Sequence, residues 1–287
     1  MTDARPPLAG LTVLVPRARD QASDFSALLR QRGAEPLEVP TIEIRPVAST
    51  AELDRAVEDL AAGRYDWVVL TSVNGVAALR ARVEALGHGP AAVTRASVAA
   101  VGPATEAALR DWGVVPDLVP EAATTAALGQ AFPARSTGTR LARSSARREE
   151  TPEPSGPRPP DHRPGPGAVL LARADLANPE LAVVLRDKGW ATTEVVAYHT
   201  VPVGTLDPAA RRRLDHGEVD WVAFTASSTV EGFLRGYGGP PPPHVRIAAI
   251  GPVTADAARA AGMRVAATAT DHTIPGLVAA IEHAVTT

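Results

Sequence analysis

The chain has 287 residues, of which 45% are hydrophobic, and this length suits one large domain or two of ordinary size. Its formal net charge of -3 disfavours nucleic-acid and membrane-surface binding, and the absence of cysteine excludes disulfides and thiolate metal sites. The N-terminus lacks a convincing signal peptide and no stretch approaches the roughly 18 apolar residues of a membrane helix, so we expect a soluble, cytoplasmic protein.

The first half of the chain alternates short apolar runs with stretches whose apolar residues fall at helical spacing. The runs are continuously apolar, which is typical of parallel strands buried on both faces of a sheet. We expect strands at 11–15, 67–70, 97–101 and 118–119, helices at 21–32, 53–60, 76–86, 103–112 and 123–132, and an extended segment at 34–46.

Residues 135–167 interrupt this pattern. Proline, arginine, serine and glutamate dominate the segment, and few of its residues are apolar. Such a composition cannot bury enough surface to offset the entropy of ordering the chain. We expect a disordered linker or insertion here.

The second half then repeats the first. Asp66 to Leu79 matches Asp220 to Phe233, and Gly102-Pro103-Ala104-Thr105 matches Gly251-Pro252-Val253-Thr254. A repeat with short connections and alternating elements predicts two similar doubly wound parallel-sheet domains, with helices on both faces of each sheet. Further strands are expected at 168–171, 221–224, 247–250 and 265–268, a helix at 181–188, and an extended segment at 192–203.

Polar turns follow several of the predicted strands. In a doubly wound sheet, ligands bind outside the carboxyl ends of the strands. The two Gly-Pro-x-Thr turns, at 102–105 and 251–254, combine a glycine that permits close approach with the exposed amides of a helix start, which favour carboxylate or phosphate. The turns 71–74 and 225–228 add hydroxyls at other helix starts. Plain helix capping is the alternative for each turn, and their convergence favours a common ligand in a cleft between two lobes.

Tyr198 breaks the symmetry of the repeat. Its counterpart in the first half is Ile42, an ordinary apolar strand residue. A structural tyrosine is one interpretation, and a phenol that donates or relays a proton is the other.

Several enzyme classes are disfavoured by missing motifs. The seven histidines show no metal-ligand spacing, and the chain has no Gly-x-Ser-x-Gly elbow, Walker loop or Gly-x-Gly-x-x-Gly after a strand. A metal, nucleotide or nicotinamide enzyme is therefore not expected.

Seven short motifs, in order, give the chain a family resemblance. They are Val-Leu-Val-Pro-Arg at 13–17, the turn at 66–76, Ala-Val-Gly-Pro-Ala-Thr at 100–105, Val-Leu-Leu-Ala-Arg at 169–173, Ala-Tyr-His-Thr at 197–200, Phe-Thr-Ala-Ser-Ser-Thr-Val at 224–230 and Ala-Ile-Gly-Pro-Val-Thr at 249–254. In this order they resemble the uroporphyrinogen-III synthase family, over nearly the whole chain outside 135–167. The turn at 225–228 departs from the family's usual Thr-Ser-Pro-Ser because Ala226 removes one hydroxyl.

The resemblance implies a domain organisation. Residues 1–38 and 204–287 would form one discontinuous α/β domain, and 47–193 would form the second, which contains the insertion at 135–167. The segments 39–46 and 194–203 would be a two-stranded connector, with the ligand cleft between the domains.

The resemblance also implies a reaction without a cofactor, in which hydroxymethylbilane closes with inversion of ring D and loss of water. Tyr198 would be the catalytic residue that assists departure of the hydroxyl. The enzyme would be a monomer, with a possible transient contact with hydroxymethylbilane synthase. Residues expected to bind the substrate are Arg17, Thr71, Ser72, Asn74, Gly102, Thr105, Arg173, Thr225, Ser227, Ser228, Gly251 and Thr254.

Two other functions compete with this one. A non-catalytic two-lobed module that binds a tetrapyrrole or another polyanion would retain the same polar turns. A two-domain enzyme resembling glycosyltransferases would need a sugar-nucleotide site, for which the sequence shows no signature.

Overall fold

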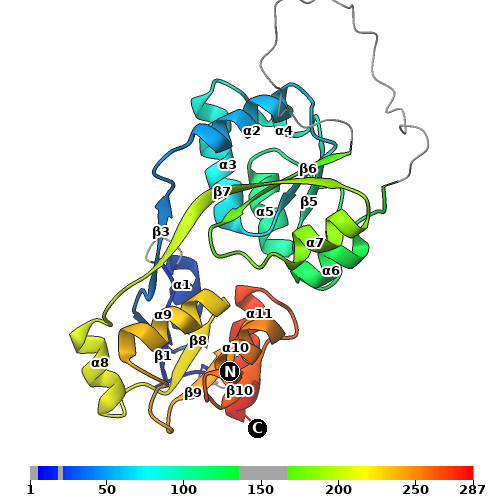
Figure 1. Ribbon diagram of the computed structural model, residues 1–287. Helices are drawn as coiled ribbons and strands as arrows, with labels where there is room; N and C mark the ends of the chain where they lie inside the picture. Colours follow the sequence, from blue (N-terminus) through cyan, green and yellow to red (C-terminus); the bar gives the residue numbers. More distant parts are fainter. Residues whose placement is uncertain (1–5, 19–21, 136–166, 287) are drawn as a thin grey trace, which may run out of the picture. The chain divides into compact units, whose positions relative to one another are not determined.

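The computed structural model describes residues 6–18, 22–135 and 167–286 (Figure 1). The chain forms two compact units: unit 1 comprises Met1–Val47, Ala174–Leu176 and Tyr198–Thr287, and unit 2 comprises Ala48–Arg173 and Ala177–Ala197. Each unit has α/β architecture, which confirms the predicted fold class. The insertion predicted at 135–167 lies outside the described residues, except for its first and last positions.

Unit 1 contains a parallel five-stranded sheet. The strand order is β10-β9-β8-β1-β2, and every pair of neighbours is parallel. The central strands β1 and β8 are buried along their full length, as expected for continuously apolar strands covered on both faces. The strands are β1 (Thr12–Val15), β2 (Glu35–Glu38), β8 (Trp221–Phe224), β9 (Arg246–Ala249) and β10 (Val265–Thr268).

Helices cover both faces of this sheet, and alternate side chains of one strand enter opposite cores. Val13 and Val15 of β1 pack in one apolar cluster with residues of α1 and α11, whereas Leu14 packs in a second cluster with residues of α8, α9 and α10. The sheet is therefore the middle of three layers. The helices are α1 (Ser23–Gln31), α8 (Pro208–Asp215), α9 (Ser227–Tyr237), α10 (Pro252–Ala260) and α11 (Ile274–Thr286).

The second sheet has the order β3-β7-β6-β4-β5. Strand β4 is parallel to both β5 and β6, but β3 is antiparallel to β7. The sheet is therefore dominated by parallel strands and not wholly parallel, because two extended segments that are distant in sequence run in opposite directions and pair. The strands are β3 (Ile42–Pro46), β4 (Trp67–Leu70), β5 (Ser97–Ala100), β6 (Ala168–Ala174) and β7 (Ala191–Pro202).

In the described residues of unit 2, six helices surround the central strands. Leu128 and Phe132, in and just after α6, pack with residues of α7 and with Val69 and Val169 of the sheet. The strand predicted at 118–119 is only an isolated bridge between Leu118 and Ala99, and the short helix α4 was not predicted. The helices are α2 (Ala51–Ala61), α3 (Val73–Ala85), α4 (Pro90–Val93), α5 (Pro103–Asp111), α6 (Thr125–Ala131) and α7 (Glu180–Asp187).

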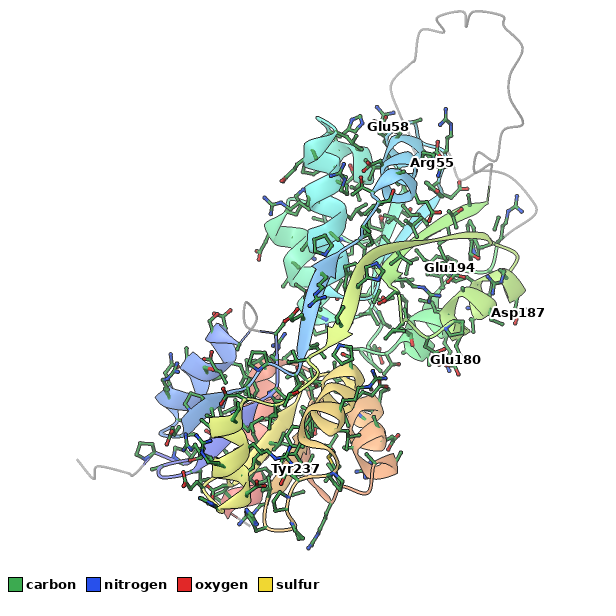
Figure 2. The ribbon with its side chains drawn as sticks, turned by 60° about the vertical axis from the view of Figure 1, so that its left-hand side comes forward. Arg55, Glu58, Glu180, Asp187, Glu194 and Tyr237 are labelled. Carbon is green, nitrogen blue, oxygen red and sulfur yellow. The ribbon has the colours of Figure 1, made fainter. Side chains whose placement is uncertain are left out.

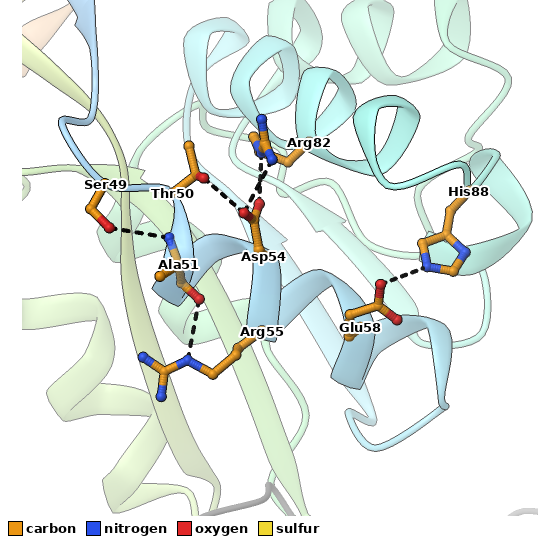
Figure 3. A network of polar contacts seen from close by, with 8 residues as sticks. All are labelled: Ser49, Thr50, Ala51, Asp54, Arg55, Glu58, Arg82 and His88. Carbon is orange, nitrogen blue, oxygen red and sulfur yellow. Dashed lines mark hydrogen bonds and ion pairs between the residues drawn. The ribbon is translucent and has the colours of Figure 1, made fainter.

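A polar network fixes α2 against α3 (Figure 3). Arg82 donates to both carboxylate oxygens of Asp54 at 2.6 and 3.1 Å, and the Thr50 hydroxyl donates to Asp54 Oδ2 at 2.7 Å. The hydrogen bond from Arg82 lowers the pKa of Asp54, and this effect exceeds the opposing effect of burial. Farther along α2, His88 Nε2 lies 3.3 Å from Glu58 Oε1. The network is structural and holds the helix that precedes β4.

The sequence repeat reappears in the order of the strands. Unit 1 places β2, β1, β8 and β9 side by side, and unit 2 places β7, β6, β4 and β5 in the same succession. In the sequence, β1 corresponds to β6, β8 to β4, and β9 to β5. Each sheet therefore combines strands from the first half of the chain with strands from the second half, and both sheets present equivalent turns at their carboxyl edges.

Candidate active site

The two Gly-Pro-x-Thr turns begin helices in equivalent places. Gly102 precedes α5 at the end of β5, and Gly251 precedes α10 at the end of β9. Pro103 and Pro252 occupy the first helical position, and no side chain caps either helix. Because proline has no amide hydrogen, the next amides of each helix are the ones left open, and they are oriented to bind an anion.

A neighbouring loop approaches the glycine of each turn closely. A methyl group at position 102 would lie 2.5 Å from the Cβ of Ala123, and one at position 251 would lie 3.0 Å from the His272 ring. Real Cβ atoms almost never show the first distance, which makes glycine necessary at position 102, whereas the second is tight and would require the His272 ring to shift. A second loop therefore lies beside each turn, through the backbone and methyl group of Ala123 at Gly102 and through the His272 ring at Gly251.

Thr105 and Thr254 lie one turn inside these helices and are only 3% and 5% exposed. Neither hydroxyl has a hydrogen-bond partner within the described parts of the chain. A buried polar group without a partner is unfavourable, and most such groups in proteins are paired. Among the described residues, a few other side chains have a polar atom that lacks both a hydrogen-bond partner and contact with solvent. Neither threonine hydroxyl is one of these atoms, so both hydroxyls reach solvent. Each unit therefore has a hydroxyl behind its uncapped helix start that no described protein group engages and that is available to a ligand.

The Thr-Ser and Thr-Ala turns differ in how their helices begin. In unit 2, the Ser72 hydroxyl accepts a hydrogen bond of 3.0 Å from the Gly75 amide and so caps α3. In unit 1, Ala226 takes the capping position of α9 and no side chain replaces the missing hydroxyl. The amides of Ser227 and Ser228 accordingly have no partner among the described residues. Loss of the hydroxyl therefore leaves the turn able to bind an anion through its backbone.

The two arginines at strand ends are not equivalent. Arg17 follows β1 and is half-buried. Arg173, near the end of β6, is 9% exposed; its guanidinium pairs with Glu194 of β7, a residue labelled in Figure 2, and donates to the Asn178 carbonyl at 2.8 Å. Its charge is thus already neutralised, and binding a substrate carboxylate would require breaking this pair.

Tyr198 lies in β7 opposite Pro46 of β3 and is 7% exposed. The loop after β6 holds its backbone. The Asp175 amide donates to the Tyr198 carbonyl at 3.3 Å, and the Asp175 carboxylate accepts from the Thr200 amide at 3.2 Å and lies 2.9 Å from His199 Nδ1. Asp175 therefore fixes the strand at the tyrosine and at the two residues that follow it.

The environment of Asp175 lowers its pKa. Burial acts in the opposite direction, but hydrogen bonds from His199 and the Thr200 amide outweigh it, so the pKa of the carboxyl lies below its usual value. Asp175 could not be found from the sequence because its partners are distant along the chain. His199 was part of the Ala-Tyr-His-Thr motif but had no assigned role.

Each unit thus places some of the predicted substrate-binding residues at one edge of its sheet. In unit 1, Arg17, the turn 225–228 and the turn 251–254 follow the neighbouring parallel strands β1, β8 and β9. In unit 2, Arg173 lies at the end of β6, and the turns 71–74 and 102–105 follow the neighbouring strands β4 and β5. Thr71, Asn74 and Thr225 are half-buried in these turns.

No group of three or more histidine, aspartate or glutamate side chains in the described residues is arranged to hold a metal ion. In the same part of the chain, no helix combines the length and hydrophobicity needed to span a membrane.

Comparison with known proteins identifies consistent relatives. A family model described as uroporphyrinogen-III synthase HemD matches residues 23–153 and 160–279. The uroporphyrinogen-III synthase of Synechococcus elongatus is 30% identical over 97% of both chains. The porphyrin biosynthesis protein HemD of Ruminiclostridium josui is 27% identical over 90% of this chain, which spans about half (45%) of that protein.

Solved structures share the fold. The chain matches a crystal structure of uroporphyrinogen III synthase from Thermus thermophilus with a TM-score of 0.62 and 23% identity, over 96% of this chain and 99% of that one. It matches the Helicobacter pylori protein with a TM-score of 0.51 and 13% identity, over 94% and 97% of the two chains.

Proposed function

The chain belongs to the uroporphyrinogen-III synthase family, and we propose that it converts hydroxymethylbilane to uroporphyrinogen III, with inversion of ring D and loss of water. No cofactor takes part in the proposed reaction. The substrate is a flexible tetrapyrrole that carries acetate and propionate arms, so the main task of the enzyme is to hold it in the reactive conformation.

The observation that carries the proposal is the pair of buried threonine hydroxyls without partners. Thr105 and Thr254 occupy equivalent places behind uncapped helix starts, one in each unit. A carboxylate bound at such a turn would accept hydrogen bonds from both the open amides and the hydroxyl. We propose that both sheet edges bind carboxylate arms of the substrate in this way. Arg17 and the turns 71–74 and 225–228 complete the proposed binding set, whereas Arg173 serves to hold Glu194.

Tyr198 is the proposed proton donor. Its phenol O–H donates a proton to the terminal hydroxyl of the bilane, the carbon–oxygen bond breaks, and water leaves with formation of the protonated azafulvene (azafulvenium) cation and a phenolate. The substituted carbon of ring D then attacks the exocyclic carbon to give a spiro intermediate, which fragments and recloses with ring D inverted. Loss of a proton restores the pyrrole and allows the phenol to be reprotonated. Asp175 holds the Tyr198 backbone, so the phenol is positioned before the substrate binds.

The proposal extends to the cellular setting. Hydroxymethylbilane closes to the other isomer without an enzyme, so rapid transfer from hydroxymethylbilane synthase would favour the correct product. We propose a cytoplasmic monomer that makes transient contact with that synthase.

Turnover separates this proposal from a non-catalytic tetrapyrrole-binding module. Purified protein supplied with fresh hydroxymethylbilane is expected to consume it faster than a protein-free control. Consumption at the uncatalysed rate, together with binding of uroporphyrinogen III, would select the binding module instead.

A further inference from the structure

The loops that contact the two Gly-Pro-x-Thr turns have the same backbone structure. In unit 1, the Thr273 amide donates to the Asp271 carbonyl at 2.8 Å, and the Thr273 hydroxyl accepts from the Gly276 amide at 3.1 Å. In unit 2, the Thr124 amide donates to the Ala122 carbonyl at 2.8 Å, and the Thr124 hydroxyl accepts from the Ala127 amide at 3.0 Å. The residue in the middle of each loop differs, being His272 in unit 1 and Ala123 in unit 2.

His272 lies against the proposed anion site of unit 1. Three atoms of its ring are 3.0 to 3.3 Å from the position that a Cβ on Gly251 would occupy, so the imidazole packs on the backbone that begins α10. A backbone hydrogen bond of 2.9 Å from the Ala269 amide to the Ala249 carbonyl extends the β10–β9 pairing up to this point. The pairing of β10 with β9 therefore fixes where the loop holds the His272 ring.

The ring nitrogens of His272 have no hydrogen-bond partner within residues 6–18, 22–135 and 167–286, although the residue is half-buried. Two other histidines of the chain are paired with carboxylates: His88 with Glu58 at 3.3 Å and His199 with Asp175 at 2.9 Å. The nearest carboxylate in sequence, that of Asp271, instead accepts a hydrogen bond of 3.0 Å from the Thr273 hydroxyl. An open imidazole thus stands beside open helix amides and the unpartnered, buried Thr254 hydroxyl.

We propose that His272 is a further substrate-binding residue, whose imidazole N–H donates to a carboxylate arm held at the Gly251–Thr254 turn. This inference rests on the proposed function. Since unit 2 has Ala123 at the same place, only one of the two repeated edges gains this donor. A tetrapyrrole whose rings carry the same pair of arms would otherwise meet two similar edges. His272 therefore makes one direction of binding more favourable than the other.

The test is the variant His272→Ala, which gives unit 1 the residue that the equivalent loop of unit 2 already accommodates. Loss of one hydrogen bond to a charged group is expected to raise the KM for hydroxymethylbilane and the Kd for uroporphyrinogen III about tenfold. The melting temperature is expected to stay the same. His216→Ala, at the exposed C-terminus of α8, is the matched control and is expected to change neither constant.

A second readout follows the ring itself. In nitrogen-15 spectra of imidazole groups, the signal that is missing from His272→Ala is expected to shift when uroporphyrinogen III is added to the wild-type protein. An unmoved signal and unchanged constants, in a wild-type protein that forms isomer III, would overturn the inference alone. A wild-type protein that neither binds nor turns over the tetrapyrrole would overturn the proposed function, and the inference with it.

Discussion

The substitution Thr254→Val separates substrate binding from stability. Valine has nearly the shape of threonine but lacks the hydroxyl, and that hydroxyl has no partner in the described structure. The folded protein therefore loses no hydrogen bond, and we expect the free energy of unfolding to change by less than about 1 kcal/mol. If the hydroxyl donates to a substrate carboxylate, its removal costs about 1.5 to 3 kcal/mol of binding, which lowers kcat/KM by about 10- to 150-fold.

Thr41→Val is the matched control because its hydroxyl is fully used. Thr41 is 1% exposed, and its Oγ1 donates to the Pro16 carbonyl at 2.9 Å and to the Thr229 carbonyl at 3.2 Å. Valine here would remove a buried donor from these carbonyls, so the expected loss of stability is about 1 to 3 kcal/mol. Replacing threonine by valine is thus expected to lower kcat/KM but not stability at position 254, and to lower stability at position 41.

Urea unfolding followed by circular dichroism measures the stability of both variants, and steady-state consumption of hydroxymethylbilane measures kcat/KM. Comparable destabilisation by Thr254→Val and Thr41→Val would show that the Thr254 hydroxyl has a structural partner. An unchanged kcat/KM for a stable Thr254→Val protein would show that this hydroxyl does not meet the substrate. Either result would refute the reasoning.

Three further substitutions have defined outcomes. Tyr198→Phe is expected to lower kcat at least about tenfold in a protein that stays folded; an unchanged kcat in the turnover assay would remove the phenol from the mechanism. Ala226→Ser is expected to cap α9 as Ser72 caps α3 and to raise the stability by about 0.5 to 1 kcal/mol in urea unfolding, and a decrease would show that the turn excludes the hydroxyl. Asp54→Asn is expected to cost about 1 kcal/mol at pH 7, because Arg82 lowers the pKa of Asp54 and so stabilises the fold above the carboxyl's unfolded pKa near 4. That cost is expected to shrink as the pH falls through the lowered folded pKa, and a loss that is independent of pH would contradict the ion-pair explanation.

Local patterns in the sequence were sufficient for the strands and the polar turns. The apolar runs predicted as strands at 11–15 and 221–224 became the fully buried central strands β1 and β8, because their composition indicates that both faces are covered. Glycine and proline at 102–103 and 251–252 predicted two helix starts, because their backbone preferences act locally. The sequence repeat predicted that the carboxyl edges of the two sheets carry equivalent turns.

Features that depend on distant partners could not be predicted in this way. The antiparallel pairing of β3 with β7 joins segments far apart in sequence, and no local pattern specifies it. The burial of Arg173 against Glu194 and the contacts of Asp175 around Tyr198 likewise arise only when β6 and β7 lie side by side. His272 could have been found earlier, because the repeat aligns it with Ala123 in the same way that it aligned Tyr198 with Ile42.

The isomer composition of the product tests the central claim most directly. Fresh hydroxymethylbilane would be incubated with increasing amounts of the protein, and the oxidised products separated by chromatography. We predict that isomer III rises from the level of the protein-free control until it predominates, and that the Thr105→Val, Thr254→Val double variant needs a higher protein concentration to reach the same fraction. Isomer I alone at every concentration of the folded wild-type protein would contradict the account.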